Sequence, residues 1–178
     1  MRIVLVVITI FVSLIQSSFS QVVKSNSQKL LEALDGFCVQ NTDDFSNIDR
    51  MSKLMNFIKA SDTIKNADPA INNNGGNSYY GEYEGTRILV GYVNNGGCTI
   101  ATKSLNVNEF TKLLKKNFQI KSLQSIKEGT QIQDFFKIKE KSIYGGGIFS
   151  ITYGKKEMKS TVGSIAYLPR KVVNKLNN

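Results

Sequence analysis

The sequence predicts an α+β fold in which helices pack on one mainly antiparallel sheet. Three observations lead to this prediction. Apolar residues recur every three or four positions in two N-terminal segments and in a third near residue 110, which is the spacing of a helix face. After the second and third of these segments, apolar and polar residues alternate as in half-buried strands. Short segments rich in Gly and Asn separate the alternating stretches and favour turns.

Two helices are expected at the start of the domain. The first covers residues 25–39, with a Ser or Asn at 25–27 as its cap. The second begins near Ser46, with Asp44 or Ser46 accepting the first free N–H groups. The spacing of the apolar residues places one face of each helix in the core. The residues expected on these faces are Leu30, Leu34, Phe37 and Cys38 in the first helix, and Ile48, Met51, Leu54, Met55 and Ile58 in the second.

Residues 66–78 are predicted to be a loop, because they contain a proline, a run of asparagines and two glycines. Strands are expected after this loop at 79–85, 86–93 and 98–102. Glycine-containing turns join them, the second of which covers 94–97. These strands form an antiparallel β-meander.

The third helix is expected to start at Asn106, which with Glu109 forms a pair resembling a capping box. Its apolar stripe consists of Val107, Phe110, Leu113, Leu114 and Phe118. Three further antiparallel strands of the same sheet are predicted at 131–139, 147–154 and 160–168. Pro169 ends the last strand, and the polar residues after it are expected to form one or two helical turns.

The first 20 residues have the three parts of a secretory signal peptide. Arg2 supplies a positive charge, residues 3–15 are mainly apolar, and small residues precede Gln21 at −3 and −1. The apolar run is shorter than the roughly 20 residues that cross a bilayer, which favours cleavage near Ser20/Gln21 over an uncleaved anchor. The mature chain is then expected to be one domain, residues 21–178, without a transmembrane segment and located in the periplasm or outside the cell.

Cys38 and Cys98 are the only cysteines of the chain. In an oxidising compartment, a small even number of cysteines indicates a disulfide first. A thiol nucleophile needs a base, usually a histidine, and the chain has none. Neither cysteine has a carboxylate at the spacing of a metal site. A disulfide is therefore favoured over two separate buried thiols and over a redox or catalytic pair.

Three short motifs add a resemblance. They are Phe-Cys-x-x-Asn-Thr at 37–42, Gly-Thr-Arg-Ile-Leu-Val at 85–90 and Gly-Cys-Thr-Ile at 97–100. Together they resemble a diffuse group of small exported bacterial proteins with a Phe/Cys helix end and a mid-chain Gly-Cys-x-Ile or Val strand. The resemblance covers about 37–118, and this chain has tyrosines where members usually have a tryptophan. It implies the Cys38–Cys98 pairing and a place in the bacterial envelope, and it implies no catalytic residue because the group has no assigned activity.

The absence of histidine excludes Ser-His-Asp hydrolysis and histidine-held zinc or haem. An enzyme of this composition would depend on carboxylates, lysine or tyrosine. Glu82 and Glu84, two residues apart in one strand, come nearest to the carboxylate pair of glycoside hydrolysis, although a solvated pair is the favoured interpretation. The glycine-rich stretches at 94–97 and 144–149 lack the spacing of a phosphate-binding loop. We predict no catalytic residue, no metal and no cofactor, and favour a non-enzymatic role.

Charge is distributed unevenly along the chain. Residues 21–100 contain 7 basic and 9 acidic residues, whereas residues 101–178 contain 15 and 5. A basic half of this size favours anionic partners, and Lys112, Lys115 and Lys116 on the third helix are the first candidates to contact them. A solvated lysine-rich surface is the alternative. Nucleic acid is not an expected partner, because arginines are few and no aromatic-interleaved RNA-binding motif is present.

Tyr79, Tyr80 and Tyr83 are the second candidate binding group. A tyrosine has an apolar ring and a polar tip, so a cluster beside a loop can hold a sugar ring or a peptide. Packing against neighbouring strands is the alternative. Alternation predicts that Tyr79 and Tyr83 share one face of the sheet and that Tyr80 lies on the other.

These observations lead to a functional hypothesis. The chain is expected to be an exported envelope protein that acts as a non-enzymatic binding or accessory module and contacts an anionic lipid, a lipopolysaccharide or a glycan. Two alternatives stay open. One is a carboxylate- or lysine-dependent enzyme acting on a glycan or peptide, and the other is an effector secreted beyond the cell. The sequence contains no signal for an oligomeric state.

Overall fold

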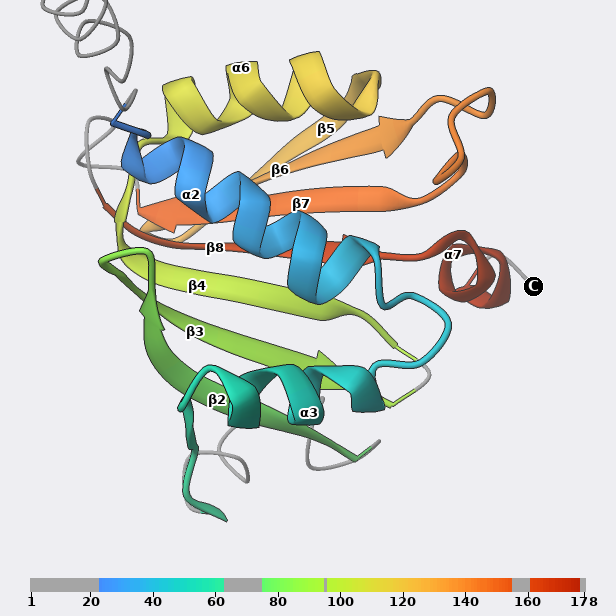
Figure 1. Cartoon of the computed structure of the whole chain (residues 1–178). Helices are drawn as coiled ribbons and strands as arrows, with labels where there is room; N and C mark the ends of the chain where they lie inside the picture. The colour runs from blue at the N-terminus through green and yellow to red at the C-terminus, as the bar shows by residue number, and fades with distance from the viewer. Residues whose placement is uncertain (1–22, 63–74, 95, 155–160, 177–178) are drawn as a thin grey trace, which may run out of the picture.

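The structure, a computed structural model, describes residues 23–62, 75–94, 96–154 and 161–176. Helices lie on one face of an eight-stranded antiparallel sheet (Figure 1). Within these ranges, no helix has both the length and the apolar character needed to cross a membrane. The expected signal peptide lies outside the described residues, as do most of the predicted 66–78 loop and most of the turn between the last two strands.

The element order confirms the predicted α+β fold, with two N-terminal helical segments, a meander, a third helix and further antiparallel strands. The helices are α2 (Asn26–Ala33), the π-helix η1 (Leu34–Val39), α3 (Ser46–Leu54), α6 (Val107–Phe118) and α7 (Arg170–Leu176). The strands are β1 (Ile58–Lys59), β2 (Gly76–Tyr83), β3 (Thr86–Val93), β4 (Cys98–Leu105), β5 (Ile120–Glu128), β6 (Gln131–Ile138), β7 (Ile148–Gly154) and β8 (Thr161–Leu168).

The sheet consists of two meanders that meet at their last strands. The strand order is β1-β2-β3-β4-β8-β7-β6-β5, so each group of four runs in chain order from one edge to the centre. β4 and β8 form the antiparallel seam between the groups, where Ile100 lies opposite Ile165. Helical segments precede each meander, α2, η1 and α3 the first and α6 the second. The two halves therefore share one topology, although the sequence shows no internal repeat.

The core lies between the helices and one face of the sheet. In β3, Ile88, Val90 and Tyr92 are buried and belong to the same cluster as Phe110 and Leu114 of α6. Successive strand residues point to opposite faces, so the side chains between these three lie on the other side of the sheet. Figure 1 shows α2, α3 and α6 together on the core side.

The first predicted helix is confirmed in extent, but it changes from an α-helix to a π-helix along its length. Ser25 and Gln28 form a reciprocal capping box, in which each side chain accepts a hydrogen bond from the other residue's backbone N–H. The last six residues, Leu34–Val39, are π-helical. The Asn41 side chain donates hydrogen bonds to the carbonyls of Gly36 and Phe37, at 2.7 and 3.2 Å, which satisfies groups that the end of the helix leaves without partners.

The second predicted helix is shorter than expected. It ends at Leu54, because Asn56 adopts a left-handed conformation with φ 56° and reverses the chain. The N–H of Asn56 donates to Lys53 and that of Phe57 to Ser52, which is a Schellman motif. Phe57 then enters the core, whereas three residues expected on the core face, Leu54, Met55 and Ile58, are 77%, 39% and 57% exposed. The helical spacing of the methionines therefore did not place Met55 in the core.

The structure also contains two strands that were not predicted from the sequence, β1 and β5. The longer one, β5, pairs with β6 at the edge of the sheet, and each of its residues except Ile120 is exposed. Its three apolar residues, Ile120, Leu123 and Ile126, recur every third position. The sequence therefore lacks the alternation of apolar and polar residues that predicts a strand. Pairing with β6 imposes the strand conformation, which is a tertiary effect.

Candidate functional site

One face of the sheet has no helix on it among the described residues, and we call it the groove face. The pairing register places five residues in one row across β1, β2, β3, β4 and β8. They are Ile58, Tyr80, Leu89, Ala101 and Ser164. Their neighbours in each strand point toward the helices, because strand side chains alternate. The groove face therefore presents a row of mainly apolar side chains outside the core.

A groove with a volume of about 820 Å³ lies on this face. Its apolar lining includes Ile58, Tyr80, Leu89, Ala101 and Val162. Ile58, Tyr80 and Val162 are 57%, 46% and 67% exposed. Clustered exposed apolar surface marks an interaction site, since covering it releases water. The volume also falls within the roughly 300–1,000 Å³ of small-molecule sites.

Three charged side chains, Glu82, Arg87 and Lys103, line the groove toward the turn that joins β2 to β3. Glu82 and Arg87 are register partners, and Lys103 lies two residues beyond Ala101 on β4. Among the described residues, none of these three side chains forms an ion pair or a hydrogen bond. Arg87 and Lys103 lie on adjacent strands and repel each other, so a bound anion would be stabilised between them.

The three candidate tyrosines do not form one site. Tyr80 lines the groove, whereas Tyr79 and Tyr83 lie on the core side, as alternation predicts. Tyr79 is only 7% exposed. Tyr83 packs edge-on against Phe37, with ring centroids 6.3 Å apart, and burial raises the pKa of its hydroxyl. Tyr80 is thus the one member of the group on the groove face.

Tyr79 belongs to a polar cluster that joins α3 to β2 and β3. Asp49 Oδ1 accepts hydrogen bonds from the hydroxyls of Tyr79 and Tyr92, at 2.7 and 2.9 Å. The Asn77 side-chain amide donates to Asp49 Oδ2 at 3.1 Å. Burial is the main cause that raises the pKa of both tyrosines, and the hydrogen bond to Asp49 is the second cause. The pKa of Tyr79 is raised, and that of Tyr92 is raised to about 12. Both phenols therefore keep their protons and act as donors to one carboxylate.

Lys112, Lys115 and Lys116 are exposed on α6, away from its buried side. Because α6 lies in the helix layer, the sheet separates these lysines from Tyr80. Tyr80 and the three lysines are therefore on opposite sides of the sheet, and the structure does not combine the two groups of candidate binding residues into one site.

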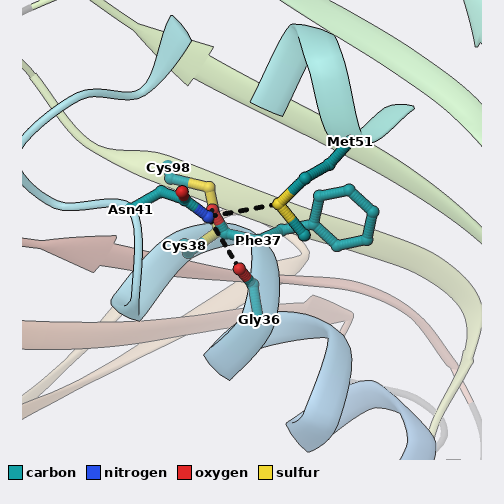
Figure 2. The surroundings of a disulfide bond; sticks show 6 residues. All are labelled: Gly36, Phe37, Cys38, Asn41, Met51 and Cys98. Carbon is teal, nitrogen blue, oxygen red and sulfur yellow. Dashed lines mark hydrogen bonds between the residues drawn. A yellow bond between two sulfur atoms is a disulfide. The ribbon is translucent and has the colours of Figure 1, made fainter. Parts of the chain in front are cut away.

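The predicted disulfide between Cys38 and Cys98 is confirmed. It joins the end of η1 to the first residue of β4, with Cα atoms 5.3 Å apart (Figure 2). Both cysteines are 0% exposed. Asn41 lies beside them and its amide also donates to the Met51 sulfur at 3.4 Å. A buried disulfide of this kind acts as a crosslink in the core, since solvent thiols do not reach it in the folded protein.

The two carboxylates weighed as a catalytic pair have different environments. Glu84 occupies the turn between β2 and β3 with φ 46°, and its carboxylate lies 3.3 Å from the Lys24 ammonium. Glu82 lines the groove instead. Within the described ranges, no three Cys, Asp or Glu residues lie close enough together to hold a metal ion. The groove therefore offers apolar surface, two cations and a single carboxylate.

Of the groove residues, Tyr80 could be predicted as a binding residue from the sequence and Glu82 was considered only as half of a carboxylate pair, whereas the remaining groove residues were not predicted to bind. The alternation in 86–93 places Arg87 and Leu89 on one face, but a single strand does not reveal which face the helices cover. Val162 reaches the groove only because β8 pairs with β4, about 60 residues earlier in the chain. That pairing has no local sequence signal.

No family model, curated protein or solved structure matches this chain significantly.

Proposed function

We propose that this protein is a non-enzymatic binding module of the bacterial envelope, and that its groove binds an amphiphilic anion. Such a ligand has an apolar chain and a carboxylate or phosphate head. The observation on which the proposal depends is the composition of the groove. It is apolar over most of its lining and has two cations toward one end, Arg87 and Lys103, that form no ion pair with any described residue. This division matches the two parts of an acylated ligand.

The apolar part of the groove favours an acyl chain over a sugar. Leu89, Ala101 and Val162 offer no hydrogen bonds through their side chains, whereas a buried sugar hydroxyl needs a partner. Each CH2 group that leaves water contributes about 0.8 kcal/mol. A chain lying over β3, β4 and β8 would cover side chains that are now exposed, and its length would set the affinity.

The cations supply the head-group contacts. The planar guanidinium of Arg87 can donate two parallel hydrogen bonds to a carboxylate or phosphate, and the Lys103 ammonium adds a point charge on the neighbouring strand. Glu82 faces Arg87 across the β2–β3 pair, so a head group would be displaced toward Lys103. We therefore assign the head to the Arg87–Lys103 side of the groove.

Two features support an envelope location. The N-terminal 20 residues have the pattern of a signal peptide, and disulfides such as Cys38–Cys98 persist mainly in oxidising compartments. Phospholipids, lipopolysaccharide and their acylated breakdown products are the amphiphilic anions of that compartment.

A fluorescent fatty acid and a fluorescent lysophospholipid would test the proposal in direct titrations. The wild type is expected to bind at least one of them. Arg87→Gln with Lys103→Gln should weaken binding about tenfold or more, since a hydrogen bond to a charged group contributes about 1.5–3 kcal/mol. Ala101→Phe should weaken binding by filling the groove while leaving both cations in place.

Lys53→Gln is the matched control, because this exposed lysine lies on α3, outside the groove. It should bind both probes like the wild type. Mass spectrometry of the bound probe should show it unchanged, which separates a binding module from an enzyme. Equal affinity in the wild type and in Ala101→Phe would refute the groove as the site, and a chemically altered probe would refute the non-enzymatic role.

A further inference from the structure

A second surface, formed by α6 and β5, combines exposed lysines from consecutive elements. Gln119, in a left-handed conformation with φ 47°, connects the two, so the helix and the edge strand lie together at one end of the sheet (Figure 1). We call this surface the lysine edge. Its cations are Lys112, Lys115 and Lys116 on α6 and Lys121 and Lys127 on β5, and all five are exposed.

The cations of the lysine edge are not neutralised within the described protein. Among the residues that the structure describes, none of the five lysine side chains forms an ion pair or a hydrogen bond. The nearby carboxylates already have partners. Glu109 accepts a hydrogen bond from Ser27, Asp134 accepts one from Tyr153, and Glu140 pairs with Lys137 and Arg170. Glu128, at the end of β5, is the one carboxylate of residues 106–141 without a partner in the described residues. The surface therefore has a net positive charge available to an external anion.

Apolar side chains lie among these cations. Leu123 and Ile126 of β5 are 46% and 43% exposed. Leu123 lies at an irregularity of the β5–β6 pairing. Its neighbours Ser122 and Gln124 pair with consecutive residues of β6, so Leu123 itself has no partner on that strand. Exposed apolar residues on an edge strand are a liability unless charges or bulges protect them. Along the strand they lie between Lys121 and Lys127. The pairing with β6 places Lys121 and Ile126 on one face of the sheet and Lys127 on the face that α6 covers, so the edge presents apolar and basic side chains together. A combination of this kind suits a surface that enters the interface of a bilayer.

We propose that the lysine edge docks on an anionic phospholipid bilayer, with the lysines contacting head groups and with Leu123 and Ile126 entering the interface. Lysines suit this partner because their compact charges respond to the diffuse negative potential of a membrane, whereas directed recognition of single phosphates favours arginine. A soluble polyanion would use the lysines but not the two apolar side chains. The bilayer is therefore the partner that accounts for both features.

This proposal does not depend on the groove. α6 lies in the helix layer and the groove on the other side of the sheet, and β5 is the strand farthest from the β1–β4 half that supplies most of the groove. The structural alternative is that cations in the last turn of α6, Lys115 and Lys116, only stabilise the helix end. Lys112, Lys121 and Lys127 are outside that turn, so changing these three tests docking alone.

Cosedimentation with vesicles of phosphatidylglycerol and phosphatidylcholine would test the docking. The wild type should bind these vesicles, bind pure phosphatidylcholine much less, and release as salt increases. Lys112→Gln, Lys121→Gln and Lys127→Gln together should weaken binding about fivefold for each lysine changed. The control triple variant Lys53→Gln, Lys59→Gln and Lys175→Gln has the same change of charge on other elements and should bind like the wild type.

Tryptophan fluorescence would locate the contact, because the chain contains no tryptophan. Emission from Leu123→Trp should shift to shorter wavelength with anionic vesicles, while emission from Leu54→Trp, on α3, should not. Equal shifts at both positions, equal loss of binding in both triple variants, or binding to heparin but not to vesicles would overturn the proposal. Ala101→Phe should bind vesicles normally, so failure of the groove and failure of the docking surface give different results.

Discussion

At the scale of single residues, Asp49 has an unusual number of partners for a carboxylate on a surface helix. Two phenols and one amide donate to it, and they come from β2 and β3. In Asp49→Asn, an amide NH2 group replaces one of the two carboxylate oxygens, so it would face a donor of Tyr79, Tyr92 or Asn77 instead of accepting its hydrogen bond. We expect the free energy of unfolding to fall by about 1–3 kcal/mol, the cost of leaving a buried polar group unsatisfied. Urea unfolding would measure it, and Asp43→Asn, at an exposed position, should change stability by about 0.5 kcal/mol or less.

The same cluster gives the protein a dependence on high pH. The pKa of Tyr92 is raised from 10 to about 12, first by burial and then by the hydrogen bond to Asp49. The folded state holds this proton more tightly than the unfolded state, so stability is complete below pH 10 and is lost as pH rises toward 12. In Asp49→Asn the second cause is absent. The loss of stability between pH 10 and 12 should then be smaller, and absorbance titration should show a lower tyrosine pKa that remains above 10.

Gly81 and Gly91 differ in what a side chain at each would meet. A Cβ at Gly81 would overlap the ring of Phe57, which is buried and stacks on Phe37 at a centroid distance of 5.6 Å. A Cβ at Gly91 would lie 3.6 Å from Ser78 Cβ, an ordinary contact. Gly81→Ala should therefore destabilise the fold by about 1–3 kcal/mol. Gly91→Ala, the matched strand substitution, should be neutral or stabilise it by up to about 1 kcal/mol. Thermal unfolding of the two variants would measure this difference. An equal loss of stability in Gly81→Ala and Gly91→Ala would contradict the explanation.

At the scale of elements, the disulfide fixes η1 to β4 across a sequence separation of 60 residues. In the chain-entropy model, a closed loop of this length contributes about 4 kcal/mol by restricting the unfolded chain. Reductant should therefore lower the urea midpoint strongly. Cys38→Ala with Cys98→Ala should have a low midpoint that reductant does not change. An unchanged midpoint for the reduced wild type would show that packing of η1, not the crosslink, holds these elements together.

The elements with strong local signals could be predicted from the sequence, and those that depend on distant pairing could not. The predicted caps, one of residues 25–27 and Asn106, mark helix starts correctly, because a cap acts within one turn; in the structure the first of them is Ser25. The end of α3 was misplaced because Asn56, rather than a glycine or proline, reverses the chain. β5 was missed because its partner β6 supplies the conformation. The disulfide could be predicted from the cysteine count, whereas the groove required knowledge of which face the helices cover.

At the scale of the whole molecule, the sheet order predicts a gradient of local stability. β4 and β8 are paired on both sides at the centre, whereas β5 is paired on one side and exposed along nearly its whole length. Amide hydrogen exchange should therefore be slowest in residues 98–105 and 163–168 and fastest, among the strands longer than two residues, in 120–128. Mass spectrometry of peptides would measure this order. Slow exchange in β5 that appears only at high protein concentration would instead show that the edge pairs with another chain.

The seam between β4 and β8 also has a consequence for folding during synthesis, in which the N-terminal half of the chain is made first. Both cysteines and the first meander precede residue 106, so both partners of the crosslink are present before the second half of the chain has been synthesised. Until β8 arrives, however, β4 is an open edge with unpaired backbone groups, which is a template for pairing with other chains. The strand β8 thus covers the open edge of the first meander. A chain that stops short of residue 161 would be crosslinked by its disulfide, yet the edge of β4 would be free to aggregate.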